Sequence, residues 1–279
     1  MSIDKKGITL SFAGEALNLP APGQNSVLKE KNIPLFSLET KTPLRDFDIV
    51  AFSINYELNY TNVLNMLSLG GVPLRRIERL ESDPFVIAGG PSVVNPAPIS
   101  EFFDAFFIGE AEEGMTEIID AAVKNLKIKR DKNEFLREIS KIDSIFIPGK
   151  KEKAKKQFVK NFDASFYPAK QIVPLIEVIH DRISLEIMRG CPNRCRFCQA
   201  GAIYRPLRTR SVDRILEIAK DAYRFTGYEE ISLLSLSSGE HPKILEILSK
   251  LMEEFKDRRG SISMPSLKAE NLVKNFPKI

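Results

Sequence analysis

The stretch Gly190-Cys191-Pro192-Asn193-Arg194-Cys195-Arg196-Phe197-Cys198 decides how the rest of the chain is interpreted. It holds all three cysteines of the 279-residue chain, at the spacing Cys-x3-Cys-x2-Cys. Structural cysteines are usually scattered and buried, whereas thiols this close together are typical of metal ligation. An odd number of cysteines also argues against a framework of disulfides. The sequence therefore predicts that Cys191, Cys195 and Cys198 bind a metal or a metal cluster.

Two kinds of metal centre are compatible with three thiolates on one loop. A four-iron cluster held in this way keeps one iron without a protein ligand, so a small molecule can bind there. Structural zinc takes four protein ligands, and the chain has only two histidines, His180 and His241. His180 is predicted at the far end of the preceding strand, and only His241 is placed to reach. A zinc site is therefore short of a ligand, and an iron-sulfur cluster is favoured.

The residues around the cysteine loop predict an alternation of strands and helices. Strands are predicted over 183–188, 230–236 and 262–264, and helices over 212–225 and 244–255. Gly227 is the predicted stop of the first of these helices. Parallel strands with alternating polar residues suit a barrel whose lumen is an active site, with the chemistry at the carboxyl ends of the strands.

The first half of the chain shows a second series of this kind. Continuous apolar runs predict strands over 49–54, 85–88 and 105–108. Helices are predicted from Leu58 to an end at Gly70-Gly71, over 99–103 and over 111–126. Strands that are apolar throughout are typical of a parallel sheet covered on both faces. We therefore predict an α/β protein with a Rossmann-like domain over residues 45–126 and the first part of a TIM-type barrel over 181–279. Residues 1–44 are predicted to be an irregular segment and residues 127–180 a connector.

Two glycine clusters, Gly89-Gly90-Pro91-Ser92 and Gly109–Gly114, follow strands of the predicted Rossmann-like domain. Ligands of open α/β sheets bind at this edge, where backbone N–H groups can approach a phosphate or another polar group. A nucleotide or corrinoid site and simple tight turns both fit the glycines. The lysines between Lys150 and Lys160 likewise fit either contact with an RNA backbone or a solvated surface.

Composition and charge limit the classes of protein to which the chain can belong. Its net charge of +4 and its 43% hydrophobic residues are those of a folded protein with a weak preference for anionic partners. The N-terminus has no apolar segment of signal-peptide length, and no run of about 18 apolar residues occurs. We therefore expect a cytoplasmic protein without a membrane partner.

The cysteine loop resembles the signature of the radical S-adenosylmethionine (SAM) superfamily, in which an aromatic residue such as Phe197 precedes the third cysteine and the motif follows the first strand of a βα series. The resemblance implies that Cys191, Cys195 and Cys198 hold a [4Fe-4S] cluster whose open iron is chelated by the amino and carboxylate groups of S-adenosylmethionine. It further implies an enzyme that takes an electron from a donor protein and generates a 5'-deoxyadenosyl radical. Candidate substrates are RNA and protein.

The same resemblance suggests residues that contact S-adenosylmethionine. Phe197 holds the position that contacts adenine, partly through its backbone. A Gly-Gly-Glu-Pro-like turn at the end of the second strand usually binds the methionine ammonium. Ser237-Ser238-Gly239-Glu240-His241-Pro242 stands in its place, so Ser237, Ser238, Gly239 and Glu240 are the expected cofactor contacts.

Over residues 33–279 the chain is similar to uncharacterised radical SAM proteins with an N-terminal cobalamin-binding-like domain. The similarity is carried by Ile33–Glu39, Tyr56–Asn62, Ala88–Pro91 and Arg189–Gly201. The Asp-x-His-x-x-Gly pattern that supplies a cobalt-binding histidine in many corrinoid domains is absent, which leaves cobalamin doubtful.

A complete radical SAM barrel has more strands than the sequence provides after the cysteine loop. We therefore expect a truncated or split enzyme, with a second chain completing the barrel. The alternative is a non-catalytic iron-sulfur-binding fragment. Six arginines lie around the loop in the sequence, and they are Arg189, Arg194, Arg196, Arg205, Arg208 and Arg210. They could bind an anionic substrate or form ion pairs with local carboxylates such as Glu186.

Overall fold

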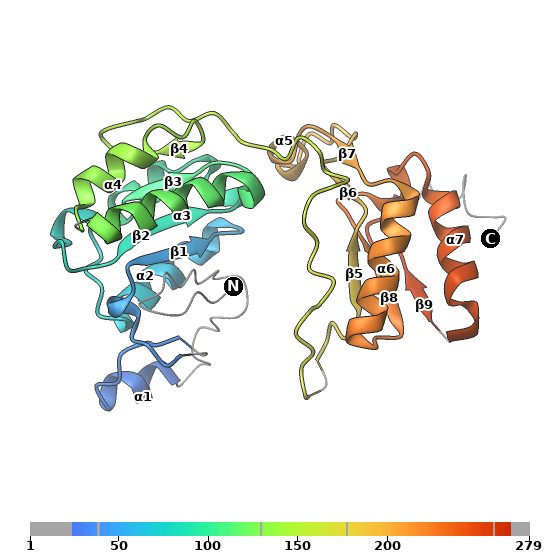
Figure 1. Cartoon of the computed structure of the whole chain (residues 1–279), viewed down its shortest axis with the longest axis horizontal. Coiled ribbons are helices and arrows are strands. Elements are labelled where there is room, and N and C mark those ends of the chain that lie inside the picture. The colour runs from blue at the N-terminus through green and yellow to red at the C-terminus, as the bar shows by residue number, and fades with distance from the viewer. Residues whose placement is uncertain (1–23, 38–39, 129, 177, 259, 269–279) are drawn as a thin grey trace. The chain divides into compact units, whose positions relative to one another are not determined.

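The computed structural model describes residues 24–37, 40–128, 130–176, 178–258 and 260–268. The chain divides into two compact units, Met1–Val159 and Lys160–Ile279 (Figure 1). Each unit is built on a sheet that is wholly or mainly parallel. The predicted α/β class is therefore confirmed.

The first unit contains a four-stranded sheet in the order β1-β2-β3-β4. Its strands are β1 (Ile49–Ser53), β2 (Phe85–Gly89), β3 (Ala105–Phe107) and β4 (Ile145–Phe146). The first three are parallel, and β4 runs antiparallel to β3. The strands β1, β2 and β3 lie where the apolar runs predicted them. The edge strand β4 comes from residues that the sequence assigned to a connector.

Helices cover both faces of this sheet. They are α2 (Tyr60–Leu69) on one face and α3 (Ala111–Ile128) with α4 (Lys132–Ile139) on the other. Successive strand residues point to opposite faces, so Val50 packs in the core with α2 while Ile49 packs in the core with α3 and α4. This double covering explains why the strands are apolar throughout. In the segment predicted to be irregular, α1 (Gln24–Glu30) is helical, and the predicted helix over 99–103 is a 3-10 helix over Ala97–Phe102.

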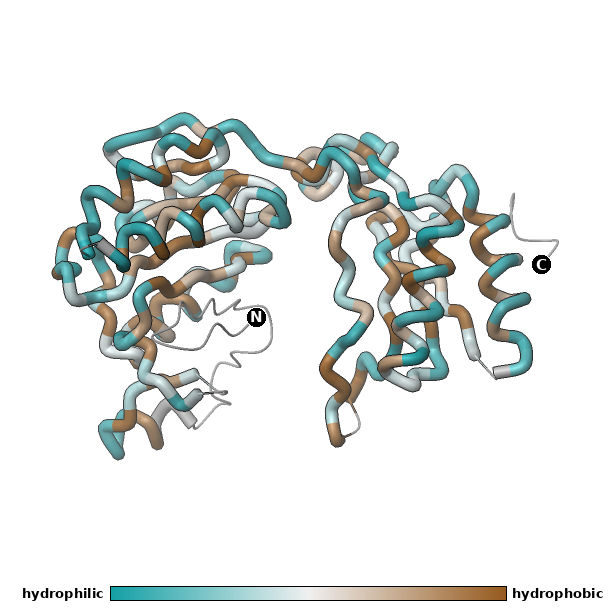
Figure 2. Tube along the Cα trace, viewed as in Figure 1, coloured by the Kyte–Doolittle hydropathy of each residue, from teal (hydrophilic) through white to brown (hydrophobic). Residues whose placement is uncertain are grey.

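The second unit contains a parallel sheet in the order β5-β8-β9. Its strands are β5 (Ile183–Glu186), β8 (Glu230–Leu234) and β9 (Ser261–Ser263), and the helices α6 (Val212–Thr226) and α7 (Ile244–Phe255) follow β5 and β8 along the chain. Polar and apolar residues alternate along α6 and α7 (Figure 2), and their apolar residues pack with Leu185 and Leu233 in one core. Ser184 and Glu186 alternate with these buried residues on β5.

The ends of α6 follow from local chemistry. The Ser211 hydroxyl caps the first turn by accepting a hydrogen bond from Arg214 N–H at 3.3 Å. Gly227 ends the helix in the left-handed conformation, with φ of 71°. The predicted stop is therefore confirmed.

The predicted strand over 183–188 is interrupted at Ile187. After β5 the chain forms β6 (Met188–Arg189), which pairs antiparallel with β7 (Arg208–Thr209). The cysteine motif and the short helix α5 (Ala200–Ile203) lie between these two strands. The cysteine loop, residues 190–207, is therefore a long connection whose two ends are joined by the pairing of β6 with β7.

Candidate iron-sulfur and S-adenosylmethionine site

Three connecting segments leave the carboxyl ends of the second unit's parallel strands. The cysteine loop follows β5 and β6, the turn at residues 237–240 follows β8, and residues 264–268 follow β9. In a parallel sheet these ends lie at one edge, which is where such folds place their ligands. The three segments are therefore the components of the candidate site.

The cysteine loop begins at a glycine that no other residue replaces without strain. Gly190 has φ of 92°, and a Cβ added to it would lie 2.8 Å from the Tyr204 carbonyl oxygen and 2.9 Å from that of Pro206. The backbone thus passes against the returning end of its own loop. Glycine alone combines this close approach with a positive φ.

The three cysteines are free thiols on the exposed part of this loop. Cys191 and Cys195 are partly exposed and Cys198 is exposed. A turn links the last two, because Cys198 N–H donates to the Cys195 carbonyl oxygen at 3.1 Å. Phe197 is 91% exposed, so its ring is available to a ligand.

In the described part of the chain, no three His, Cys, Asp or Glu side chains form a group that could hold a metal ion. The structure therefore does not gather the three thiols at one point. The donor set itself suits an iron-sulfur cluster, because the thiols are reduced and solvent-accessible and lie on a single loop.

The turn after β8 is a 3-10 helix over Ser238–Glu240 in which the residues expected to contact the cofactor have different environments. Ser237, Ser238 and Gly239 are buried. The Ser238 hydroxyl donates to the Leu233 carbonyl oxygen at 3.3 Å and lies 3.0 Å from the Ser235 hydroxyl. The Ser238 hydroxyl therefore stabilises the turn. Ser237 takes part through its backbone, because its N–H donates to the Ser235 hydroxyl at 3.2 Å.

Glu240 connects this turn to the cysteine loop. Asn193, between the first two cysteines, donates from Nδ2 to Glu240 Oε1 at 3.4 Å. Lys268, after β9, donates to Asn193 Oδ1 at 2.5 Å and lies 3.8 Å from Glu240 Oε1. The structure thus joins two predicted site segments through Asn193 and Lys268, which the sequence did not indicate. The position of Asn193 between two cysteines was the one available signal, and Lys268 had none.

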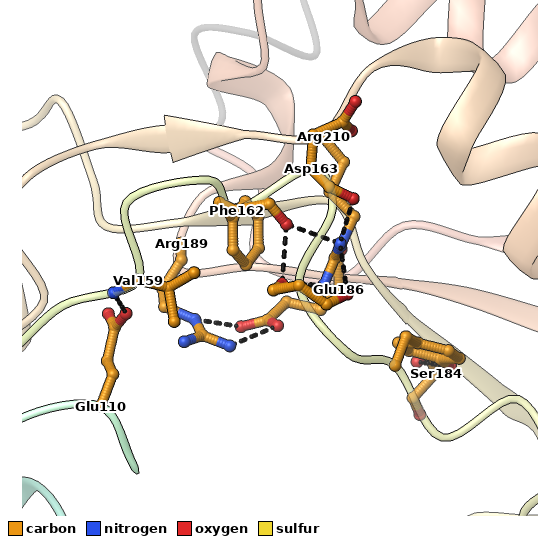
Figure 3. Close-up of polar contacts among 10 residues, drawn as sticks. Glu110, Val159, Phe162, Asp163, Ser184, Glu186, Arg189 and Arg210 are labelled. Atoms are coloured by element: carbon orange, nitrogen blue, oxygen red, sulfur yellow. Dashed lines mark hydrogen bonds and ion pairs between the residues drawn. The ribbon is translucent and has the colours of Figure 1, made fainter. Parts of the chain in front are cut away.

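Among the six arginines around the loop, Arg189 and Arg210 make the contacts drawn in Figure 3, and Arg208 donates from Nε to the Pro206 carbonyl oxygen at 3.1 Å. Arg189 forms two hydrogen bonds with Glu186, from Nε at 2.9 Å and from Nη2 at 2.8 Å. Arg210 is only 2% exposed and donates to carbonyl oxygens of Glu186, Phe162 and Asp163. Both guanidinium groups also lie over the Phe162 ring, at 4.9 Å and 4.3 Å from its centre.

These contacts decide between the two interpretations for Arg189 and Arg210. Burial lowers the pKa of Arg210, and the nearby Glu186 carboxylate opposes that shift. The predicted carboxylate pairing holds for Arg189 and Glu186, while Arg210 is held mainly by backbone carbonyls. Arg194 and Arg196, on the loop itself, are exposed to solvent.

The histidine considered for zinc is engaged elsewhere. His241 is 4% exposed; its Nδ1 accepts a hydrogen bond from Lys243 N–H at 3.1 Å, and its Nε2 lies 3.3 Å from the Arg210 carbonyl oxygen. Because Nδ1 must accept, Nε2 carries the proton and donates. Burial also lowers the pKa of His241, in the direction that favours the neutral ring. In this conformation neither ring nitrogen is available to a metal.

The glycine clusters of the first unit serve close backbone packing. Gly90 has φ of 99°, and an added Cβ would lie 2.6 Å from the Ile54 carbonyl oxygen. A Cβ on Gly109, whose φ is 121°, would collide with the backbone of Gln157. The segment 157–159 covers the carboxyl end of β3, where Glu110 accepts a hydrogen bond from Val159 N–H at 2.7 Å (Figure 3). These contacts support the tight-turn interpretation of both clusters.

Two family models match the chain. The model described as radical SAM proteins, N-terminal, matches residues 10–148, and the radical SAM superfamily model matches residues 185–276. The chain belongs to the radical SAM superfamily. The second match includes the cysteine motif, the turn after β8 and Lys268.

A curated relative is the Uncharacterized protein MJ0966 of Methanocaldococcus jannaschii. It is 28% identical over 256 residues, which cover 91% of this radical SAM chain and 52% of the relative. The chain therefore spans about half the length of the curated relative that it matches.

Two solved structures of TsrM, a radical S-adenosylmethionine methyltransferase from Kitasatospora setae, have a similar fold. One holds cobalamin and a [4Fe-4S] cluster, and the other holds tryptophan substrate and a SAM analog, aza-SAM. Each gives a TM-score of 0.50 at 12% identity over 89% of this chain and 48% of TsrM. At this identity the likeness shows the fold alone, and it bears out the predicted combination of a cobalamin-binding-like unit and a radical SAM unit.

Proposed function

We propose that this chain binds a [4Fe-4S] cluster through Cys191, Cys195 and Cys198 and binds S-adenosylmethionine between that cluster and the turn at Ser237–Glu240. The observation that supports this most directly is the hydrogen bond between Asn193 and Glu240 at 3.4 Å, which links the two expected binding segments. A cluster with one open iron would supply reductive cleavage of S-adenosylmethionine and a 5'-deoxyadenosyl radical.

The residues of the chain suit such a ligand in three ways. The exposed Phe197 ring offers an apolar surface for adenine beside the third cysteine. The Glu240 carboxylate offers an acceptor for the methionine ammonium. The buried Ser238 hydroxyl helps to hold the backbone of the turn in place, so its carbonyl groups need not reorganise when the ligand binds.

The first unit does not offer a histidine-ligated corrinoid site. Both histidines of the chain, His180 and His241, belong to the second unit. The carboxyl end of β3 is covered by the chain's own segment 157–159. We therefore assign no step of the reaction to cobalamin. The substrate class, RNA or protein, is a hypothesis carried by the family resemblance.

Anaerobic reconstitution tests the proposal. The wild-type chain is expected to take up about four irons and, after reduction, to convert S-adenosylmethionine to 5'-deoxyadenosine. Cys191→Ser, Cys195→Ser and Cys198→Ser should each abolish the iron chromophore. Gln199→Ser is the matched control, because it places the same new residue in the same exposed loop without removing a thiol.

The outcomes separate the functional alternatives. Failure of the wild-type chain to take up iron during reconstitution would refute the cluster assignment. A cysteine variant that keeps the chromophore would show that this cysteine is not a ligand. A chain that binds iron but leaves S-adenosylmethionine intact after reduction would favour the non-catalytic alternative. The split-enzyme alternative predicts an adjacent reading frame that encodes further barrel strands, and a search for that reading frame tests it.

A further inference from the structure

We propose that Lys268 is a positioning residue that holds the cysteine loop against the turn after β8 before any cofactor binds; its consequence for S-adenosylmethionine rests on the proposed function. The side chains of Asn193, Glu240 and Lys268 form a closed network. They come from three different strand-end segments that are far apart in the sequence. The network therefore fixes the relative position of segments that the sheet alone leaves free to move.

The chemistry of the three groups determines how they pair. A lysine ammonium can only donate hydrogen bonds, an ionised carboxylate can only accept them, and an asparagine amide can do both. Asn193 accepts from Lys268 at 2.5 Å and donates to Glu240 at 3.4 Å, so each end of its amide has the partner that it requires. Lys268 thereby sets the orientation of the amide in the middle of the cysteine motif. The 3.8 Å ion pair between Lys268 and Glu240 closes the network.

A second contact anchors the same segment. Ser238 N–H donates to the Ser266 carbonyl oxygen at 3.2 Å, two residues before Lys268. The segment after β9 is therefore attached to the turn by its backbone and to the cysteine loop by the lysine side chain. Because its base is fixed, Lys268 loses less conformational entropy in making its contacts than a lysine on a free segment would.

Positioning matters here because the proposed ligand must reach both segments at once. S-adenosylmethionine would bridge the open iron on the cysteine loop and the turn that contains Glu240. Groups that must meet a ligand together bind it well only when their separation is already correct. Loss of Lys268 should therefore leave the three cysteine ligands in place while weakening the binding of S-adenosylmethionine.

The test compares Lys268→Met with Lys250→Met. The two lysines have the same exposed side-chain fraction, 42%, and both form ion pairs, but Lys250 pairs with Asp213 and Glu246 away from the site. After reconstitution, Lys268→Met should keep the wild-type iron content and bind S-adenosylmethionine about tenfold more weakly, the value of one charge-assisted hydrogen bond. Lys268→Arg should recover most of the affinity, and Lys250→Met should match the wild type.

Hydrogen exchange of the cluster-free chain separates positioning from direct contact with the ligand. We expect Lys268→Met to speed amide exchange in peptides covering 191–199 and 237–240, because both segments lose a shared anchor. Unchanged exchange there would overturn the inference, as would wild-type affinity for S-adenosylmethionine or a loss of iron in Lys268→Met. If the wild type takes up no iron, the proposed function fails by itself. The exchange data then decide whether Lys268 positions the two segments.

Discussion

Replacing Gly190 with alanine tests whether the cysteine loop depends on a close approach between its two ends. The added Cβ would lie 2.8 Å and 2.9 Å from the carbonyl oxygens of Tyr204 and Pro206, and 3.0 Å from Leu207 Cα. All three are backbone atoms, so no side chain can rotate away to relieve the contact. The returning end of the loop would have to shift by several tenths of an ångström.

Gly227→Ala is a control that separates this contact from backbone strain. Gly227 also has a positive φ, 71°, but nothing lies within 4 Å of an added Cβ. A positive φ alone costs alanine about 1 kcal/mol, which is the loss in unfolding free energy expected for Gly227→Ala. Overpacking adds about 1–3 kcal/mol, so Gly190→Ala should lose about 2–4 kcal/mol in total.

Urea unfolding followed by circular dichroism measures both variants against the wild type, with the two units fitted as separate transitions. Iron uptake after reconstitution provides a second measurement, in which Gly190→Ala should fall and Gly227→Ala should match the wild type. Equal losses of unfolding free energy in the two variants would refute the reasoning, because the positive φ would then account for the whole effect.

Three further predictions concern two buried side chains and one close backbone contact. Arg210→Met should lower the unfolding free energy by about 3–5 kcal/mol in urea titrations, because it leaves buried carbonyl groups without their donor; Arg214→Met, which loses one half-exposed ion pair, should cost about 0.5 kcal/mol. Burial holds the pKa of His241 in the folded chain below its usual 6.5. As the pH falls below 6.5, the unfolded chain therefore takes up a proton at His241 before the folded chain does, and the free energy of unfolding decreases. His241→Asn, which keeps an acceptor in the side chain, should flatten that fall in unfolding measurements between about pH 5 and pH 8. Gly109→Ala should displace the segment that begins at Gln157 and make it more sensitive to limited proteolysis, whereas a wild-type cleavage pattern would contradict the close contact seen between them.

The sequence predicted the longer elements because their residues repeat with the period of a helix or a strand. Apolar spacing placed α6 and α7, and the glycine after α6 predicted where that helix ends. The apolar runs of β1 and β2 indicated a sheet covered on both faces. The apolar patterns were informative because each of these helices and strands buries at least one whole face, and a buried face needs apolar residues at regular spacing.

Short elements lack such a signal. The strands β4, β6 and β7 have two residues each, which is too few to show a period. Their pairing depends on contacts with distant segments, such as that of Phe107 with Ile145. For this reason the sequence treated β4 as part of a connector and continued β5 through Ile187.

Polar contacts between distant residues were also beyond sequence reasoning. Arg210 is charged and follows the cysteine loop, so its sequence context suggested contact with an anionic substrate or pairing with a local carboxylate. Its burial depends on carbonyl groups of Phe162 and Asp163, almost fifty positions earlier in the chain. Such a site is created by the fold, because the acceptors that stabilise the guanidinium converge only after the segment before β5 has packed.

The register of the parallel sheet explains why the components of the candidate site meet. Ile183 of β5 pairs with Ile231 of β8, which pairs with Ile262 of β9, so the three strands are nearly level. Because the strands are in register, the segments that follow them begin at the same edge of the sheet, close enough for side chains to connect them. Asn193 and Lys268 are 75 positions apart, yet their side chains meet at 2.5 Å. The cysteine motif alone predicts candidate ligands, whereas the parallel register brings the loop that carries them to the turn after β8 and to Lys268.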